Sequence, residues 1–68
     1  MADRLANPIK ERRAELGLTQ AELADKVGVT RKTVNTVENG VFTPSATLAI
    51  KLAQALNVPV EALFWIER

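Results

Sequence analysis

The chain has 68 residues and a formal net charge of +1, so it is long enough for one domain with a single small core. It contains no cysteine and no histidine, which excludes a disulfide framework, the usual zinc sites and the nucleophile–base pairs of most hydrolytic enzymes. No apolar run approaches the roughly 18 residues of a membrane span, and the N-terminus lacks an apolar signal segment. We therefore expect one cytoplasmic domain over residues 1–68 with no enzymatic activity, metal, cofactor, small-molecule ligand or membrane partner.

The N-terminal part of the chain is predicted to hold one short helix. Met1–Ala6 shows no pattern and is expected to be frayed or to form a short extended arm. Asn7 and Pro8 suit the N-cap and the first turn of a helix over about 8–16, because proline has no N–H to leave unsatisfied there. The two positions of this helix that we expect to be buried are Ile9 and Leu16.

A short turn joins the next two predicted helices, over about 20–27 and 31–39. The first of them opens with Thr19-Gln20-Ala21-Glu22, a capping box in which the threonine and glutamate side chains satisfy backbone amides. Gly28 closes that helix and Thr30 caps the next one, while Gly40 ends it. A glycine-containing turn of about four residues fixes two helices at a steep angle, as in the helix-turn-helix motif.

The helix after this turn has two chemically different sides. Val34 and Val37 fall on the side that can pack against the preceding helix. The opposite side spans an arc of roughly 140° and is basic and hydrogen-bonding; it holds Arg31, Lys32, Asn35, Thr36 and Asn39. Most polar helix faces are only solvated surface. Here the packing turns the face outward within a locally basic stretch, so we expect it to meet a polyanion.

Two further helices are predicted, over about 46–56 and 60–64. Ser45 caps the first and Asn57 ends it, but its apolar arc is roughly 220° wide, more than one small core can cover. Either the aromatic end of the chain closes the bottom of the core, or it buries against a second subunit. The excess apolar surface favours a homodimer, with candidate interface residues Ile50, Phe64, Trp65 and Ile66.

Five ordered blocks of the sequence closely resemble the Cro and phage-repressor type helix-turn-helix family, also called the XRE family. The blocks are GLTQAELA, VGVT, VENG, TPS and LAQAL, and the likeness covers about Ile9 to Phe64. It implies an all-α fold: a compact five-helix, lambda-repressor-like DNA-binding domain with room for a short extended C-terminal tail. The short chain is similar in size to the small stand-alone regulators of that family.

The resemblance also implies roles for individual residues. In the family the helix after Thr30 is the recognition helix, which lies in the DNA major groove. The positions that read bases in the family correspond in this chain to Arg31, Lys32 and Thr36, with Asn35 as a flanking candidate. Positions at the DNA backbone match Gln20, Thr30, Asn39 and Thr43. Finally, two positions match a pair that members often bury as a structural ion pair between the first and third helices, namely Arg13 and Glu38.

These roles imply a sequence-specific regulator of transcription that binds double-stranded DNA. We expect a repressor that acts as a homodimer on a near-palindromic operator. An enzyme is disfavoured because the chain has no histidine, no cysteine and no glycine-rich phosphate loop. The alternative is an antitoxin-like protein-binding module with autoregulatory DNA binding, because the apolar excess on the last two helices would serve a partner protein equally well.

Overall fold

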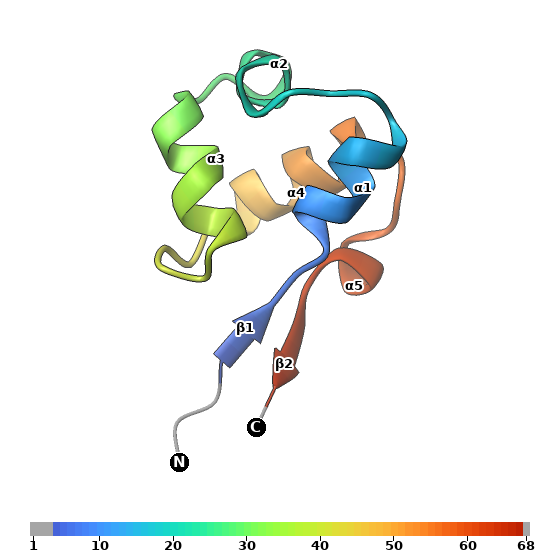
Figure 1. The fold of residues 1–68 in the computed structure, drawn as a ribbon. Helices are drawn as coiled ribbons and strands as arrows, with labels where there is room; N and C mark the ends of the chain where they lie inside the picture. The colour runs from blue at the N-terminus through green and yellow to red at the C-terminus, as the bar shows by residue number, and fades with distance from the viewer. Residues whose placement is uncertain (1–3, 68) are drawn as a thin grey trace.

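The computed structural model describes residues 4–67, which form five helices and a two-stranded sheet (Figure 1). The helices are α1 (Ile9–Glu15), α2 (Gln20–Val27), α3 (Arg31–Glu38), α4 (Ala46–Ala55) and α5 (Val60–Leu63). Each lies within the range predicted for it, and the predicted five-helix architecture is confirmed. None of the helices in this part of the chain is long and apolar enough to cross a membrane.

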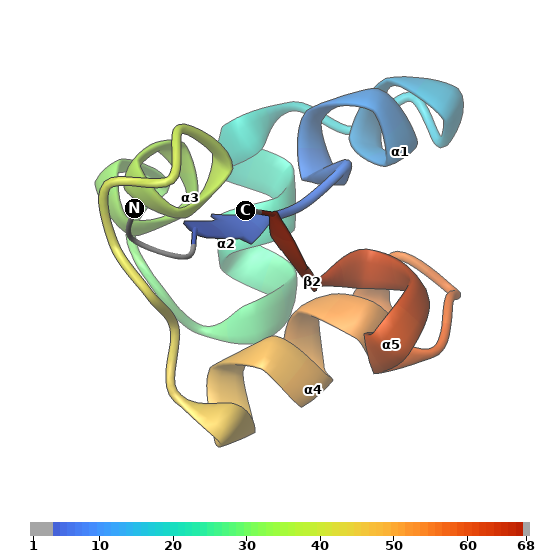
Figure 2. The same ribbon diagram turned by 90° about the horizontal axis from the view of Figure 1, so that it is seen from below.

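A small antiparallel sheet joins the two ends of the described chain. β1 (Arg4–Ala6) pairs with β2 (Trp65–Glu67), with Ala6 opposite Trp65. The two strands leave the helical body side by side and project from one end of it (Figures 1 and 2). The predicted fold class, a helical domain of five helices with a short extended C-terminal tail, is confirmed, and the pairing of that tail with the N-terminal segment is what the sequence did not predict. The N-terminal segment, predicted to be frayed or a short arm, is paired from Arg4 onward, and Met1–Asp3 lie outside the described residues.

Side-chain caps determine where three of the helices begin. At α2 the capping box is complete: Thr19 Oγ1 accepts from the Glu22 amide at 3.0 Å, and Glu22 Oε1 accepts from the Thr19 amide at 2.9 Å. This backbone hydrogen bond is the main reason that the pKa of the Glu22 carboxyl is lowered. The hydroxyls of Thr30 and Ser45 cap α3 and α4 in the same way, by accepting from the amide three residues on.

Asn7 ties the start of α1 to the end of α3. Its Oδ1 accepts from the Ile9 amide at 3.2 Å. The helix begins one residue later than predicted, so Pro8 and not Asn7 is its N-cap, and Asn7 stabilises the first turn from the position before the cap. Its Nδ2 donates to the Val37 carbonyl at 3.0 Å. One short side chain thus stabilises the first turn of α1 and holds that turn against α3.

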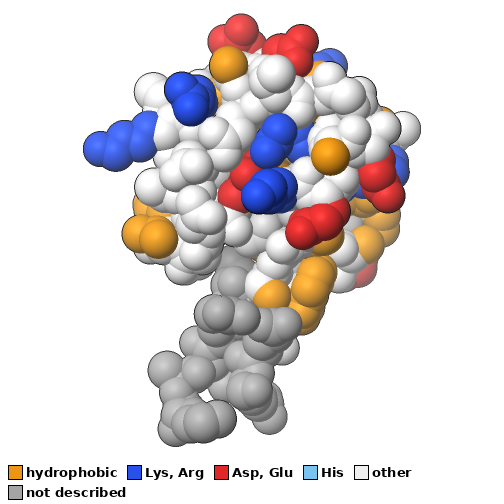
Figure 3. Space-filling model, in the orientation of Figure 1, with side chains coloured by type: hydrophobic (Ala, Val, Ile, Leu, Met, Phe, Trp, Pro, Cys, Tyr) orange, Lys and Arg blue, Asp and Glu red, His pale blue; other side chains and the backbone are white. Residues whose placement is uncertain are grey.

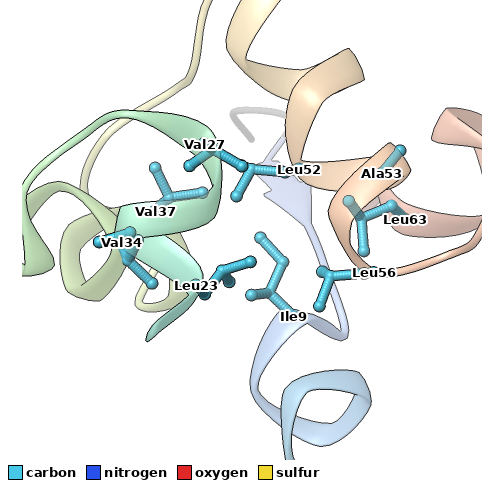
Figure 4. Packing of buried hydrophobic residues seen from close by; sticks show 10 residues of the cluster. Ile9, Leu23, Val27, Val34, Val37, Leu52, Ala53, Leu56 and Leu63 are labelled. Atoms are coloured by element: carbon cyan, nitrogen blue, oxygen red, sulfur yellow. The ribbon is translucent and has the colours of Figure 1, made fainter. Parts of the chain in front are cut away.

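Among the side chains of residues 6–66, ten buried apolar ones form a core between the helices (Figure 4). They are Ile9, Leu23, Ala24, Val27, Val34, Val37, Leu52, Ala53, Leu56 and Leu63. The prediction that Leu16 is buried was wrong, since its side chain is 41% exposed. Gly17, in the left-handed region at φ +70°, reverses the chain after α1, and Leu18 packs against the core instead.

Candidate nucleic-acid interface

The turn between α2 and α3 sets these two helices across each other. Gly28 takes a left-handed conformation at φ +75°, and the Val29 amide donates to the Ala24 carbonyl at 3.0 Å, which closes α2. In Figure 1 α2 is viewed along its axis while α3 is viewed from the side, so the two axes cross steeply. This is the helix-turn-helix arrangement that the short glycine turn predicts.

The recognition-helix candidate α3 buries one side and exposes the other. Val34 and Val37 are each 2% exposed and face the core (Figure 4). The other side carries four exposed residues and the half-buried Thr36; the exposed ones are Arg31, Lys32, Asn35 and Asn39. Basic side chains project over the start of α3 at the upper left of Figure 3. The structure thus places all of the proposed base-reading residues on one side of one helix.

An open hollow lies between the start of α2 and the exposed side of α3. It has a volume of about 360 Å³ and is lined by Gln20, Arg31, Lys32 and Asn35. Among the sequence-predicted site residues, the structure therefore brings one backbone-contact candidate from α2 next to three base-reading candidates from α3. Thr43 lies outside this hollow, exposed in the loop that follows α3.

A buried ion pair holds the C-terminal end of α3 against α1. Arg13 Nε donates to Glu38 Oε2 at 2.9 Å, and the two side chains are only 15% and 4% exposed. Arg13 Nη2 also donates to Glu38 Oε1 at 3.4 Å, and its Nη1 donates to the Leu18 carbonyl at 2.9 Å. Glu38 is the only acid on α3, and this pairing removes its charge from the exposed side of the helix.

Glu38 also accepts a hydrogen bond from Gln20. Gln20 Nε2 lies 3.1 Å from Glu38 Oε1, so the amide that was predicted to meet the DNA backbone is already bound within the protein. Sequence reasoning did not find this bond. Its two residues lie on different helices, and nothing in their spacing indicates that they meet.

Several polar side chains of α3 also bond within the helix. Thr36 Oγ1 donates to the Thr33 carbonyl at 2.9 Å, which leaves its oxygen lone pairs and its methyl group for a partner. Asn39 Nδ2 donates to Asn35 Oδ1 at 3.2 Å, so Asn35 keeps its own N–H groups as donors. Thr30 Oγ1 is engaged as the cap and lies 3.0 Å from Thr33 Oγ1. Beside the cations Arg31 and Lys32, this face therefore offers donors from Asn35 and an acceptor from Thr36.

Comparison with known proteins decides the family. The family model described as "Helix-turn-helix" matches residues 9–63, which is most of the chain. The chain belongs to the helix-turn-helix family. The XRE resemblance seen in the sequence is thereby confirmed, and this is a family of DNA-binding transcription regulators, not of enzymes.

Similar proteins cover nearly the same length. The uncharacterized HTH-type transcriptional regulator YgzD of Bacillus subtilis is 43% identical over 63 residues, covering 93% of this chain and 96% of that protein. The restriction-modification controller protein C.AhdI from Aeromonas hydrophila superposes with a TM-score of 0.77 at 38% identity, covering 82% of this chain and 81% of that one. The P22 c2 repressor, solved in complex with a synthetic operator, superposes with a TM-score of 0.76 at 28% identity, covering 78% of this chain and 80% of that one.

Two apolar side chains of this helix-turn-helix regulator stand exposed beside the polar face. Val41 and Phe42 follow α3 directly, and both of their amides donate to the Thr36 carbonyl, at 2.9 and 3.2 Å. An apolar patch lies over this loop at the lower left of Figure 3. Sequence reasoning treated the loop only as a connection, although two adjacent apolar residues after a polar helix face were a visible signal.

The candidate dimer residues of the helix-turn-helix regulator differ in exposure. Ile50, Trp65 and Ile66 are exposed, whereas Phe64 is half-buried and packs against the core. Successive side chains of a strand point to opposite faces, so Trp65 and Ile66 lie on the two sides of β2. Phe64 thus closes the bottom of the core, and the other three candidates remain on the surface.

Proposed function

We propose that the protein is a sequence-specific, double-stranded DNA-binding repressor that acts as a homodimer on a near-palindromic operator. The observation that carries this proposal is the outward polar side of α3, with Arg31, Lys32 and Asn35 around one hollow beside Gln20. The P22 c2 repressor, which shares the fold, was solved in complex with a synthetic operator, and this supports the same use of the domain here.

The side chains of α3 have the chemistry for reading base edges. Arginine can bind guanine O6 and N7 together, and lysine can donate to the same acceptors. Thr36 can accept from a base amino group or pack its methyl against thymine. We therefore propose Arg31, Lys32 and Thr36 as base-reading residues, with Asn35 beside them. Contacts with DNA phosphates would fix the position of this helix. We propose that these contacts are made by Gln20, Thr30, Asn39 and Thr43.

The test is to remove the two cations at the start of α3. Arg31→Ala and Lys32→Ala are each expected to weaken binding to the operator by about 1–3 kcal/mol, because each removes donors to a base edge. The operator is first obtained by selection from random duplexes with the parent protein. Fluorescence anisotropy at fixed salt then measures the dissociation constants.

Lys51→Ala is the matched control, since it also removes one positive charge. Lys51 is exposed on α4 and does not line the hollow. This control should weaken binding slightly, and by the same factor for the operator and for unrelated duplexes. The α3 variants should instead lose part of their preference for the operator over unrelated duplexes. If both α3 variants keep the parent's preference, the base-reading face is assigned wrongly.

The homodimer is proposed to form through the apolar surface of α4 and β2. A dimer of this motif places its two recognition helices about 34–36 Å apart, one turn of DNA. Ile66→Asp is expected to raise the dimer dissociation constant at least about tenfold, because the dimer would bury an unpaired carboxylate. Sedimentation equilibrium measures this change.

Leu16→Asp is the control for the dimer experiment. It places the same charge at another exposed aliphatic residue, directly after α1, and should leave the parent's association unchanged. If the parent itself sediments as a monomer, the homodimer is wrong. The exposed apolar residues would then favour the antitoxin-like alternative, in which a partner protein covers them.

A further inference from the structure

We propose that Glu38 is a positioning residue for DNA binding, which fixes the orientation of the Gln20 amide at the edge of the hollow. This inference rests on the proposed function and extends it to a residue that is itself buried. The geometry behind it is one chain of contacts across three helices, from Arg13 on α1 through Glu38 on α3 to Gln20 on α2.

The buried carboxylate determines which end of the amide faces it. An ionised carboxylate only accepts hydrogen bonds, and an amide offers both a donor end and an acceptor end. Gln20 must therefore present Nε2, at 3.1 Å from Glu38 Oε1, because the flipped amide would place its carbonyl oxygen against the carboxylate. Arg13 holds the other oxygen, Oε2, at 2.9 Å, so the carboxylate cannot turn away.

The consequence for DNA lies in the remaining groups of the same amide. Nε2 has two hydrogens, and the bond to Glu38 uses one of them. The second is left as a donor on a side chain that lines the hollow with Arg31, Lys32 and Asn35. A donor whose orientation is already fixed loses less conformational entropy when it binds a phosphodiester oxygen. Glu38 thus contributes to affinity through Gln20, although as an anion it repels DNA.

A double-mutant cycle separates this role from a structural one. Glu38→Gln keeps the size of the side chain and an oxygen acceptor for Arg13. It also adds N–H groups that can bind the Gln20 carbonyl and flip the amide. On the operator selected by the parent, Glu38→Gln is expected to weaken binding about 3- to 10-fold, the usual range for one hydrogen bond. In a Gln20→Ala background, the same substitution should cause no loss.

The sign of this effect distinguishes orientation from charge. Removing an acid from α3 should by itself strengthen binding to a polyanion. A loss in the parent background, absent in the Gln20→Ala background, is therefore the expected signature. A matched cycle pairs Glu38→Gln with Lys32→Ala, which lines the same hollow; here the two effects should add. A loss that persists in the Gln20→Ala background would overturn the proposal.

A measurement on the free parent protein keeps the proposal testable if Glu38→Gln does not fold. In the NMR spectrum, one Nε2 proton of Gln20 should be shifted downfield and exchange with solvent more slowly than the side-chain amide of the exposed Gln54. Equal exchange of the two amides would show that Glu38 does not hold Gln20. If the parent selects no duplex, the proposed function fails, while this NMR result still decides whether the amide is held.

Discussion

Leu23→Ala is expected to lower the free energy of unfolding by about 2–5 kcal/mol, the usual cost of deleting a buried leucine side chain. Leu23 is fully buried and comes from α2, where it lies between Ile9 of α1 and Val34 of α3 (Figure 4). A domain of this size has about 3–5 kcal/mol of net stability. The variant should therefore be largely unfolded at 37 °C, as measured by urea denaturation followed by circular dichroism.

Leu16→Ala is the control, because it deletes the same atoms from a leucine that is 41% exposed. Its free energy of unfolding should change by no more than about 0.5 kcal/mol. Equal destabilisation by the two substitutions would contradict the described core and restore the sequence-based expectation that Leu16 is buried.

Glu38→Ala is expected to lower the free energy of unfolding by about 3–5 kcal/mol. The substitution leaves the Arg13 guanidinium nearly buried without its anion, and the desolvation of that charge is then uncompensated. It also removes the acceptor of Gln20, so α3 loses its polar contacts with α1 and α2 at this point. The same urea experiment measures the loss.

The chain offers a matched control for this ion pair. Arg12 Nη1 lies 3.2 Å from Glu15 Oε1, but Glu15 is 66% exposed, so solvent screens the pair. Glu15→Ala should change the free energy of unfolding by less than about 0.5 kcal/mol. A loss at Glu38 as small as the one at Glu15 would show that burial adds nothing to the Arg13–Glu38 interaction.

The parts of the fold that could be predicted are those that short segments determine. Thr19, Thr30 and Ser45 each cap the helix that the sequence assigned to them, because a cap needs only the amides two or three residues further on. The burial of Val34 and Val37 followed from helical periodicity alone. Local chemistry therefore defined the helices and the two sides of α3.

The parts that could not be predicted depend on groups far apart in the chain. The pairing of β1 with β2 joins opposite ends of the sequence. Each strand has only three residues, so neither has a sequence pattern that indicates its partner. The contact between Arg13 and Glu38 was expected only through the family resemblance, not from their spacing. The bond between Gln20 and Glu38 required the relative placement of two helices, which no local pattern supplies.

The paired terminal strands also have a mechanical consequence. Arg4 lies opposite Glu67 at the outer end of the antiparallel pair, so tension applied to the two ends of the described chain would load its hydrogen bonds one after another, as in a zipper. Nine of the ten core residues named above lie on the five helices, and the tenth, Leu56, directly follows α4. The two strands should therefore separate at low force, while the five helices and the packing between them stay intact.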